Sequence, residues 1–299
     1  MAKNLDVIEQ TTNELTLAER QQKKPKRKKK KLKAVWMYTL LSIFLVVSIF
    51  PFYWMFIGAT NDSSKMFTNP PTLLPGDQFM TNLTNLNESI GIFRVLFNSL
   101  FVSGLYVVIA LAVCASAAYV LAKYNFKGKK FIFTAFLLSM MIPYQATLIP
   151  LFQMMSDFNL LNTYFAVIAP QLCFPFAIFL LRQNFLAFPT ELMESARLDG
   201  ASETRIFISI VIPSMRPALA AASIFLFMTQ WNNFMWPLVV LNTNDMYTFP
   251  VALSSLMGLS YIDYGQVMMG VTLATVPIIA FFLTLQKQFI SGMLGSALK

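Results

Sequence analysis

Amide and indole side chains lie close together in one apolar segment of the chain. They are Gln230, Trp231, Asn232, Asn233 and Trp236. Amides hydrogen-bond hydroxyl groups and indole rings stack on the apolar faces of sugars, so this group could bind a neutral polyhydroxylated ligand. The same side chains could instead hydrogen-bond neighbouring helices and anchor a membrane interface. The residue types alone favour neither role.

The polar stretch over residues 183–217 predicts two short helices joined by a corner. Thr190 is a candidate N-cap of the first helix, and Glu194 would lie near its start, where the helix dipole favours an acid. Leu192 and Ala196 are four residues apart and would share one face of this helix.

Gly200 suits the left-handed conformation in which helices often end. Ser202 would cap a second helix over residues 203–210, which Pro213 would end. Such a unit could pack on itself at the membrane surface or insert into a soluble partner.

The stretch resembles the EAA loop of binding-protein-dependent ABC importer permeases. The pattern of that loop is Glu-Ala-Ala, three residues, Gly, nine residues, Ile, one residue and Leu-Pro. At the same intervals this chain has Glu194-Ser195-Ala196, Gly200, Ile210 and Ile212-Pro213. Ser195 stands in place of Ala and Ile212 in place of Leu, and both changes are small. The Asp199-Gly200-Ala201 triplet is also similar to the family.

This resemblance implies a type I ABC importer permease fold and a set of partners. In the family, two related permease subunits form the path, each docks a cytoplasmic ATPase through its EAA loop, and an external binding protein delivers the solute. The residues implied in coupling to the ATPase are Glu194, Ser195, Ala196, Arg197, Asp199, Gly200, Ala201, Ile210 and Pro213. ATP and Mg²⁺ would be held by the partner ATPase, so no catalytic residue, metal site or cofactor is expected on this chain.

Three other stretches are similar to the carbohydrate branch of the family. They are residues 70–75, Asn98-Ser99 and residues 231–238. A sugar or oligosaccharide is therefore the implied solute, with a phosphorylated or peptide solute as the alternative. The resemblance further implies that part of residues 242–264 reaches into the binding protein and that the tail over residues 286–299 contacts the ATPases.

The elements that hold these residues must lie in a membrane. Hydrophobic residues make up 56% of the 299 residues and charged residues only 12%, against roughly 25% charged in ordinary globular proteins. A water-soluble fold of this size could not cover so much apolar surface. The chain has no histidine, which excludes His-based catalysis and His-ligated metal sites. It also has no G-x-x-x-x-G-K-[ST] loop to hold ATP phosphates.

Six apolar segments are long enough to cross about 30 Å of hydrocarbon. They cover residues 34–57, 95–122, 131–155, 163–182, 218–241 and 265–286. We therefore predict an all-α membrane protein of six spans, with a basic tail over residues 1–33 and a second tail over residues 287–299.

The distribution of cations predicts the orientation of these spans. One side of the predicted topology holds 21 of the 23 Lys and Arg residues, and only Lys65 and Arg94 fall on the other. The positive-inside rule then places both termini in the cytoplasm of a prokaryotic cell, with the chain in its (inner) membrane. The basic run over residues 23–33 could bind nucleic acid, but its position directly before a span favours a lipid-facing anchor.

The predicted spans two to six contain almost no ionisable residue, which weakens the hypothesis of a proton- or sodium-coupled carrier. They contain prolines that would kink the helices; each kink could serve ordinary packing, but together they favour a bundle that opens a path over an inert anchor. Cys114 and Cys173 both lie in apolar runs and are expected to be packing residues. A free-standing facilitator is the main rival to the importer, and a membrane enzyme lacks the groups it would need.

Overall fold

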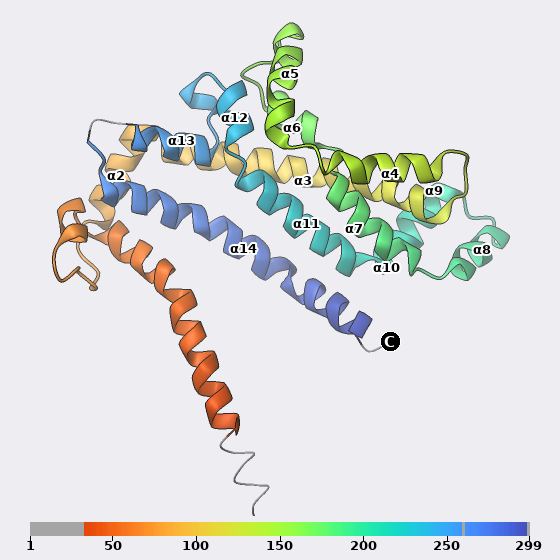
Figure 1. Ribbon diagram of the computed structural model, residues 1–299, viewed down its shortest axis with the longest axis horizontal. Helices are drawn as coiled ribbons and strands as arrows, with labels where there is room; N and C mark the ends of the chain where they lie inside the picture. Colours follow the sequence, from red (N-terminus) through yellow and green to blue (C-terminus); the bar gives the residue numbers. More distant parts are fainter. Residues whose placement is uncertain (1–32, 259–260, 298–299) are drawn as a thin grey trace, which may run out of the picture. The chain divides into compact units, whose positions relative to one another are not determined.

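The computed structural model describes the backbone of residues 33–258 and 261–297, with side chains up to residue 288. All regular elements in these ranges are helical (Figure 1). The chain divides into two units, residues 1–55 and residues 56–299.

The first unit contains most of a helix that runs from Lys33 to Thr60 and is apolar enough to cross a membrane. Only 6% of its most apolar window is buried, and Phe50 and Trp54 stack on each other along it with ring centroids 6.4 Å apart. Such a helix needs lipid or another protein around it. The predicted basic tail lies outside the described residues, except for Lys33.

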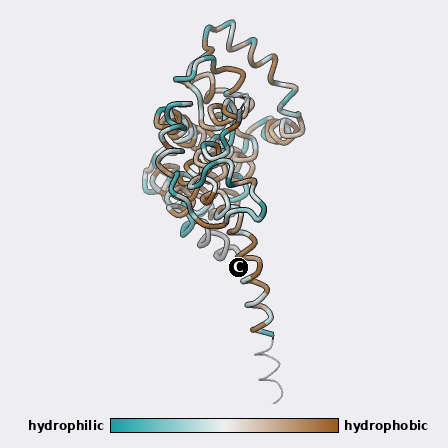
Figure 2. The backbone as a smooth tube through the Cα atoms, turned by 90° about the vertical axis from the view of Figure 1, so that its left-hand side faces the viewer, coloured by the Kyte–Doolittle hydropathy of each residue, from teal (hydrophilic) through white to brown (hydrophobic). Residues whose placement is uncertain are grey.

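The second unit is a sequence of helices joined by short connections, and hydrophobic residues recur along these helices (Figure 2). In chain order they are η1 (Ser63–Phe67), α2 (Phe79–Ile90), α3 (Ile92–Lys123), α4 (Lys129–Ser139), α5 (Tyr144–Asp157), α6 (Tyr164–Ile168), η2 (Ala169–Gln171), α7 (Pro175–Leu186), α8 (Thr190–Leu198), α9 (Glu203–Arg205), η3 (Ile206–Val211), α10 (Ile212–Ser214), α11 (Arg216–Trp231), α12 (Met235–Val240), η4 (Asn244–Met246), α13 (Phe249–Met257) and α14 (Tyr264–Ala297). The segment η3 is a π-helix.

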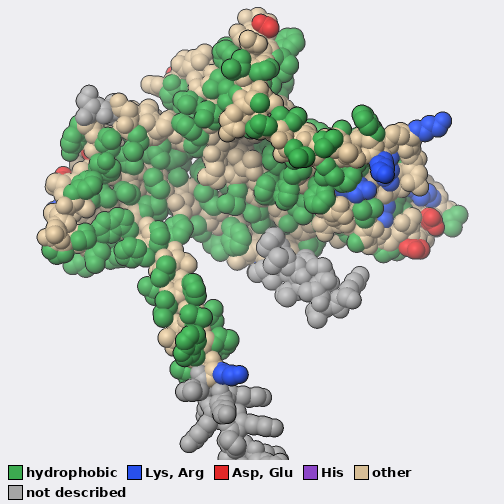
Figure 3. All heavy atoms as spheres, viewed as in Figure 1, with side chains coloured by type: hydrophobic (Ala, Val, Ile, Leu, Met, Phe, Trp, Pro, Cys, Tyr) green, Lys and Arg blue, Asp and Glu red, His purple; other side chains and the backbone are tan. Residues whose placement is uncertain are grey.

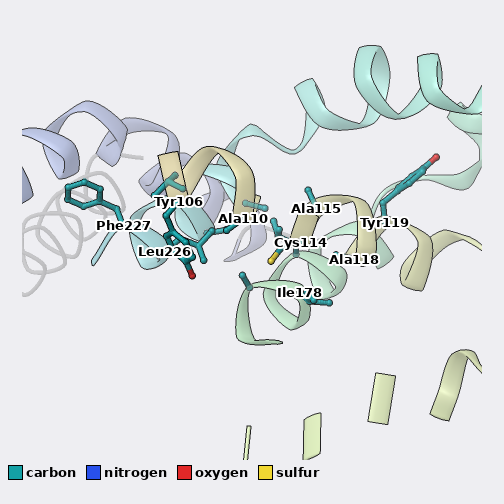
Figure 4. Packing of buried hydrophobic residues seen from close by; sticks show 14 of the residues in the cluster. Tyr106, Ala110, Cys114, Ala115, Ala118, Tyr119, Ile178, Leu226 and Phe227 are labelled. Atoms are coloured by element: carbon teal, nitrogen blue, oxygen red, sulfur yellow. The ribbon is translucent and has the colours of Figure 1, made fainter. Parts of the chain in front are cut away.

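The core of this unit forms where α3 packs against α7 and α11 (Figure 4). Small residues recur every four positions along α3, at Ala110, Cys114, Ala118 and Ala122, and all four are buried. Small side chains on one face let a neighbouring helix approach closely. Cys114 is the packing residue that we expected, whereas Cys173 is exposed in this chain, and both are free thiols.

Within the part of the chain that the structure describes, three helices are long and apolar enough to cross a membrane, or up to six if each bent helix pair is counted as one span. The three are Lys33–Thr60, α3 and the part of α14 up to Gln288. The predicted span over residues 131–155 is bent by 101° between α4 and α5, and the one over residues 163–182 is bent by 47° before α7. These bends agree with the kinks that the prolines in the two segments predict.

Prolines explain where these bends fall. Pro143 has an extended backbone just before α5, and Pro175 is the first residue of α7, where its missing N–H costs nothing. Pro150 and Pro277 instead lie inside α5 and α14, which continue past them. Proline therefore coincides with a break between helices at some positions and lies within a continuing helix at others.

The predicted fifth span, residues 218–241, differs most from expectation. It consists of α11, which ends at Trp231, and α12, which begins at Met235. At its other end α11 meets the preceding helical segment at an angle of 81°. The predicted tail after residue 286 begins as a continuation of α14, which runs to Ala297, and the side chains beyond residue 288 lie outside the described residues.

Contacts between connections place them at two ends of the second unit. Tyr124, just after α3, donates a hydrogen bond to Glu203, and Lys123 donates to the backbone oxygen of Phe188. At the opposite end of α3, Asn98 donates to the backbone oxygen of Asp245. The connections that follow α3 and α7 therefore share one end, as the charge distribution predicted, while the connection before α13 lies at the start of α3.

Candidate coupling loop and solute path

The residues that resemble the EAA loop form a compact corner at one end of the unit, where α8 packs against η3 (Figure 1). α8 begins at Thr190, and Pro189 occupies its N-cap position without a side-chain hydrogen bond. The predicted capping role of Thr190 is therefore wrong. The hydroxyl oxygen of Thr190 instead accepts a hydrogen bond of 3.4 Å from Nζ of Lys123, at the end of α3.

Gly200 forms the corner itself. Its φ angle is +80°, in the left-handed region that strongly favours glycine. The N–H of Gly200 donates to the backbone oxygen of Arg197 at 3.0 Å, and that of Ala201 donates to the oxygen of Ala196 at 3.0 Å. These bonds satisfy carbonyls at the end of α8, and the predicted left-handed helix end is confirmed.

Ser202 begins the second helical segment, as predicted, because its hydroxyl accepts a hydrogen bond from the N–H of Arg205. The segment is not the simple helix expected over residues 203–210. It passes through the π-helix that contains Ile210 and continues to Ser214. Pro213 lies within the helical segment, so the prediction that it ends the helix is wrong. The chain turns only at Met215, whose backbone leaves the helical conformation.

The faces of α8 also differ in part from expectation. Met193 and Ala196 are the buried residues of this helix, whereas Leu192 is half exposed. Glu194, Ser195 and the Asp199-Gly200 corner are exposed, and they lie beside Leu198, which is 90% exposed. Leu198 therefore presents an apolar side chain to the solvent between the acidic Glu194 and Asp199.

An ion pair that sequence reasoning missed closes this corner. Nε and Nη2 of Arg197 donate to the two carboxylate oxygens of Glu203, at 2.6 and 3.1 Å. The hydroxyl group of Tyr124 donates to the same carboxylate. The hydrogen bonds from Arg197 and Tyr124 hold the pKa of Glu203 below its usual value. Opposite charges six residues apart on either side of a helix-ending glycine were the available sequence signal.

The candidate ligand-binding residues separate into two groups. Both indoles pack inside this chain: Trp236 is fully buried and its Nε1 donates to the backbone oxygen of Ala166 at 2.9 Å. The ring of Trp231 stacks on Phe227 and Phe249, with centroids 5.5 and 6.4 Å away. These contacts favour the interhelical role that the sequence left open for the tryptophans.

The amides lie at the break between α11 and α12. Nδ2 of Asn232 donates to the backbone oxygen of Met228 at 2.8 Å, on its own helix. Asn233 lines a cavity of about 390 Å³, together with Thr147, Gln171 and Thr229. Nδ2 of Asn233 and both amide atoms of Gln230 are buried without a hydrogen-bond partner in the described structure. A buried polar group without a partner is unfavourable, so this region is suited to a polar guest.

A second polar centre anchors the connection before α13. Asn98 is fully buried, and its Nδ2 donates to the backbone oxygens of Asp245 and Tyr247 at 2.7 and 3.0 Å. Its Oδ1 accepts from the hydroxyl of Tyr164, and Ser99 accepts from the N–H of Phe249. The Asn98-Ser99 pair therefore holds residues 245–249 against α3.

Comparisons with known proteins agree with this architecture. Residues 113–294 match the family described as binding-protein-dependent transport system inner membrane component. The lactose transport system permease protein of Rhizobium radiobacter is 38% identical over 90% of this chain and 97% of its own length. The arabinooligosaccharides transport system permease protein of Halalkalibacterium halodurans is 37% identical over 88% of this chain and 96% of its own.

Solved structures show the same fold. One chain of a bacterial ABC transporter involved in the import of the acidic polysaccharide alginate has a TM-score of 0.74 and 23% sequence identity, covering 87% of this chain and 97% of its own. The chain described here belongs to the family of binding-protein-dependent transport system inner membrane components. It is a transport subunit rather than an enzyme, and membership implies an ATPase and a substrate-binding protein as partners.

Proposed function

We propose that this chain is one of two related permease subunits of an ATP-driven importer for a sugar or oligosaccharide. In this proposal it crosses the prokaryotic cell (inner) membrane six times, with both termini in the cytoplasm, and pairs with a second permease and two ATPases. Its relatives include proteins named as lactose and arabinooligosaccharide permeases, which supports a carbohydrate as the solute.

The observation that carries the coupling role is the shape of the corner around Gly200. Its inner residues, Met193 and Ala196, are buried, whereas Glu194 and Leu198 face outward. A compact corner of this kind can insert into a groove of an ATPase and move together with it. Closure of the ATPase pair would then tilt the bent helices between two states of the path.

Arg197 has a different part in this proposal from the one expected from the sequence. Its side chain pairs with Glu203 inside the corner, so we assign Arg197 the role of stabilising the conformation of the corner. Glu194 and Asp199 remain the acidic groups that would meet the ATPase.

The solute would pass the cavity at the break between α11 and α12. Asn233, Gln171, Thr147 and Thr229 give this cavity hydrogen-bonding groups, and its volume of about 390 Å³ lies within the range of small-molecule sites. The unpartnered amide of Asn233 supports its role more directly than residue type alone.

The test is purification of the tagged chain from its native membrane in mild detergent, with mass spectrometry of the proteins that remain bound. We expect a second permease and a Walker-motif ATPase. The complex should then hydrolyse ATP faster when its binding protein and a sugar are added. A chain that purifies alone, and that moves solute without ATP in vesicles, would instead be a facilitator.

The choice of solute is tested on the binding protein. A screen of neutral sugars against sugar phosphates and peptides should give binding only to sugars. A preference for a phosphorylated solute would leave the importer proposal standing and change only the proposed substrate. This alternative is tested because the chain is 29% identical to a glycerol-3-phosphate transport system permease protein of Yersinia enterocolitica.

A further inference from the structure

A cationic pocket of about 760 Å³ lies where α4 begins. Its charged wall is formed by Lys129, Lys130 and Arg182, and no carboxylate is among the described residues that line it. Figure 3 shows Lys and Arg side chains gathered at this end of the second unit, next to hydrophobic ones. The pocket therefore has the charge to bind an anion.

Neighbouring groups fix two of these cations at the wall. The guanidinium of Arg182 lies over the ring of Phe133, 3.9 Å from its centroid, and its Nε donates to the backbone oxygen of Leu121. Nζ of Lys129 donates to the backbone oxygen of Tyr124 at 2.8 Å. Both contacts tie the cations to the end of α3, where backbone carbonyls attract positive charge.

An apolar groove of about 400 Å³ continues from the pocket along the same helix. Phe131 lines both cavities, and the groove runs on past Ile132 and Phe136 to Cys173 and Pro175, at the start of α7. No residue of α4 is buried, and Phe131 is 78% exposed. The charged and the apolar cavities thus form one continuous surface.

We propose that this surface binds one anionic phospholipid, with its phosphate among Lys129, Lys130 and Arg182 and one acyl chain along the groove of α4. The proposal rests only on the chain lying in a membrane and is independent of the transported solute. The 11 residues of α4 measure about 16 Å along the helix axis, which is about half of the 30 Å hydrocarbon thickness and so about one leaflet. A soluble phosphate would satisfy the cations but leave the adjoining groove empty.

The experiment measures lipids retained by the assembled transporter, purified with its partners. The complex is equilibrated with equal amounts of palmitoyl-oleoyl phosphatidylglycerol and phosphatidylcholine and examined by native mass spectrometry. We expect phosphatidylglycerol to be retained in preference to phosphatidylcholine. Lys130→Gln should lower its retention about fivefold, because a basic residue near an anionic surface contributes about 1 kcal/mol.

Two variants serve as controls for charge and for the groove. Lys127→Gln changes the net charge equally, but Lys127 is not among the residues that line the pocket, so retention should stay unchanged. Phe131→Ser should also lower retention, and because the side chain is exposed it should leave the thermal unfolding temperature unchanged.

Four results would overturn the proposal. Equal losses with Lys127→Gln and Lys130→Gln would indicate diffuse charge attraction. Equal retention of the two lipids would exclude recognition of the phosphate charge. Displacement of the lipid by millimolar inorganic phosphate would identify a soluble anion as the ligand. Absence of retained lipid from the assembled complex would show that a partner subunit covers the surface.

Discussion

Arg197 and Glu203 pair across the corner that Gly200 makes, with Nε of Arg197 2.6 Å from Oε1 of Glu203. The pair joins the last turn of α8 to the first residue of α9. Both side chains are more than one-third exposed, so the pair adds little to the overall stability of the chain. Its effect should be to fix the angle between the two helical segments.

Substitution of Gly200 should uncouple ATP hydrolysis from transport. A Cβ atom at this position would meet no atom within 4 Å, so the cost of a side chain comes from the left-handed backbone alone. Gly200→Val should reduce uptake strongly, because a β-branched residue is rare at positive φ, whereas Gly200→Asn should retain most of it. The measurement is sugar uptake by strains with equal amounts of the protein in the membrane. Normal uptake with Gly200→Val would contradict a coupling role for the corner.

Reversal of the charge pair should restore what each single change removes. Arg197→Glu and Glu203→Arg should each reduce the stimulation of the ATPase by the binding protein, and the double variant should recover part of it. Thermal unfolding temperatures should change little, since the pair is exposed. If the double variant is no better than the worse single variant, Arg197 acts through a partner protein rather than through Glu203.

Glu203 should give the stability of the corner a pH dependence. Its pKa is lowered from 4.5 in the folded chain, so its contribution is complete above that ordinary value and is lost as the pH falls through the lowered pKa. The difference in unfolding temperature between the wild type and Glu203→Gln, which is small because the pair is exposed, should therefore be constant near neutral pH and shrink further at acidic pH. If this difference in unfolding temperature grew as the pH fell, the lowered pKa of Glu203 would be contradicted.

Asn233 should affect the affinity for the transported solute. Because Nδ2 of Asn233 is buried in a cavity wall without a partner, we expect it to donate to the solute. Asn233→Ala should raise the KM for uptake about two- to tenfold, the effect of one hydrogen bond. Asn232→Ala is the matched control, because that amide is bonded to Met228 on its own helix. Equal KM values for the wild type and Asn233→Ala would show that Asn233 does not contact the transported solute.

Asn98 should matter more for stability than its neighbour Arg94. Replacement of Asn98 by Leu leaves the backbone oxygens of Asp245 and Tyr247 without this donor, at a cost of about 1–3 kcal/mol. Arg94 also donates to Asp245, but it does so at 3.3 Å on an exposed surface, so Arg94→Gln should cost much less. Unfolding in denaturant and cleavage of residues 242–248 by protease would measure the difference.

Features set by local backbone chemistry could be predicted from the sequence. The left-handed conformation of Gly200 and the cap made by Ser202 follow from residue type and position, and both are confirmed. The positions of the helices could also be predicted from the apolar segments, because a membrane span needs a long apolar run.

Features that depend on distant segments could not be predicted in this way. Tyr124 reaches Glu203 across 79 residues, and Trp236 reaches the backbone of Ala166 across 70. Thr190 has the residue type of a helix cap, but Pro189 takes that place and Lys123 engages the hydroxyl. A sharp bend falls at Pro143 whereas α14 continues past Pro277, and the residue type alone does not distinguish the two positions.

The length of α3 gives the two ends of the unit a mechanical connection. This single helix of 32 residues extends about 48 Å, with Asn98 gripping the connection before α13 near its start and Tyr124 holding Glu203 just past its end. α3 contains no proline and packs against α7 and α11, so it should move as a rigid helix. A displacement of the Gly200 corner would then be transmitted along α3 to residues 245–249.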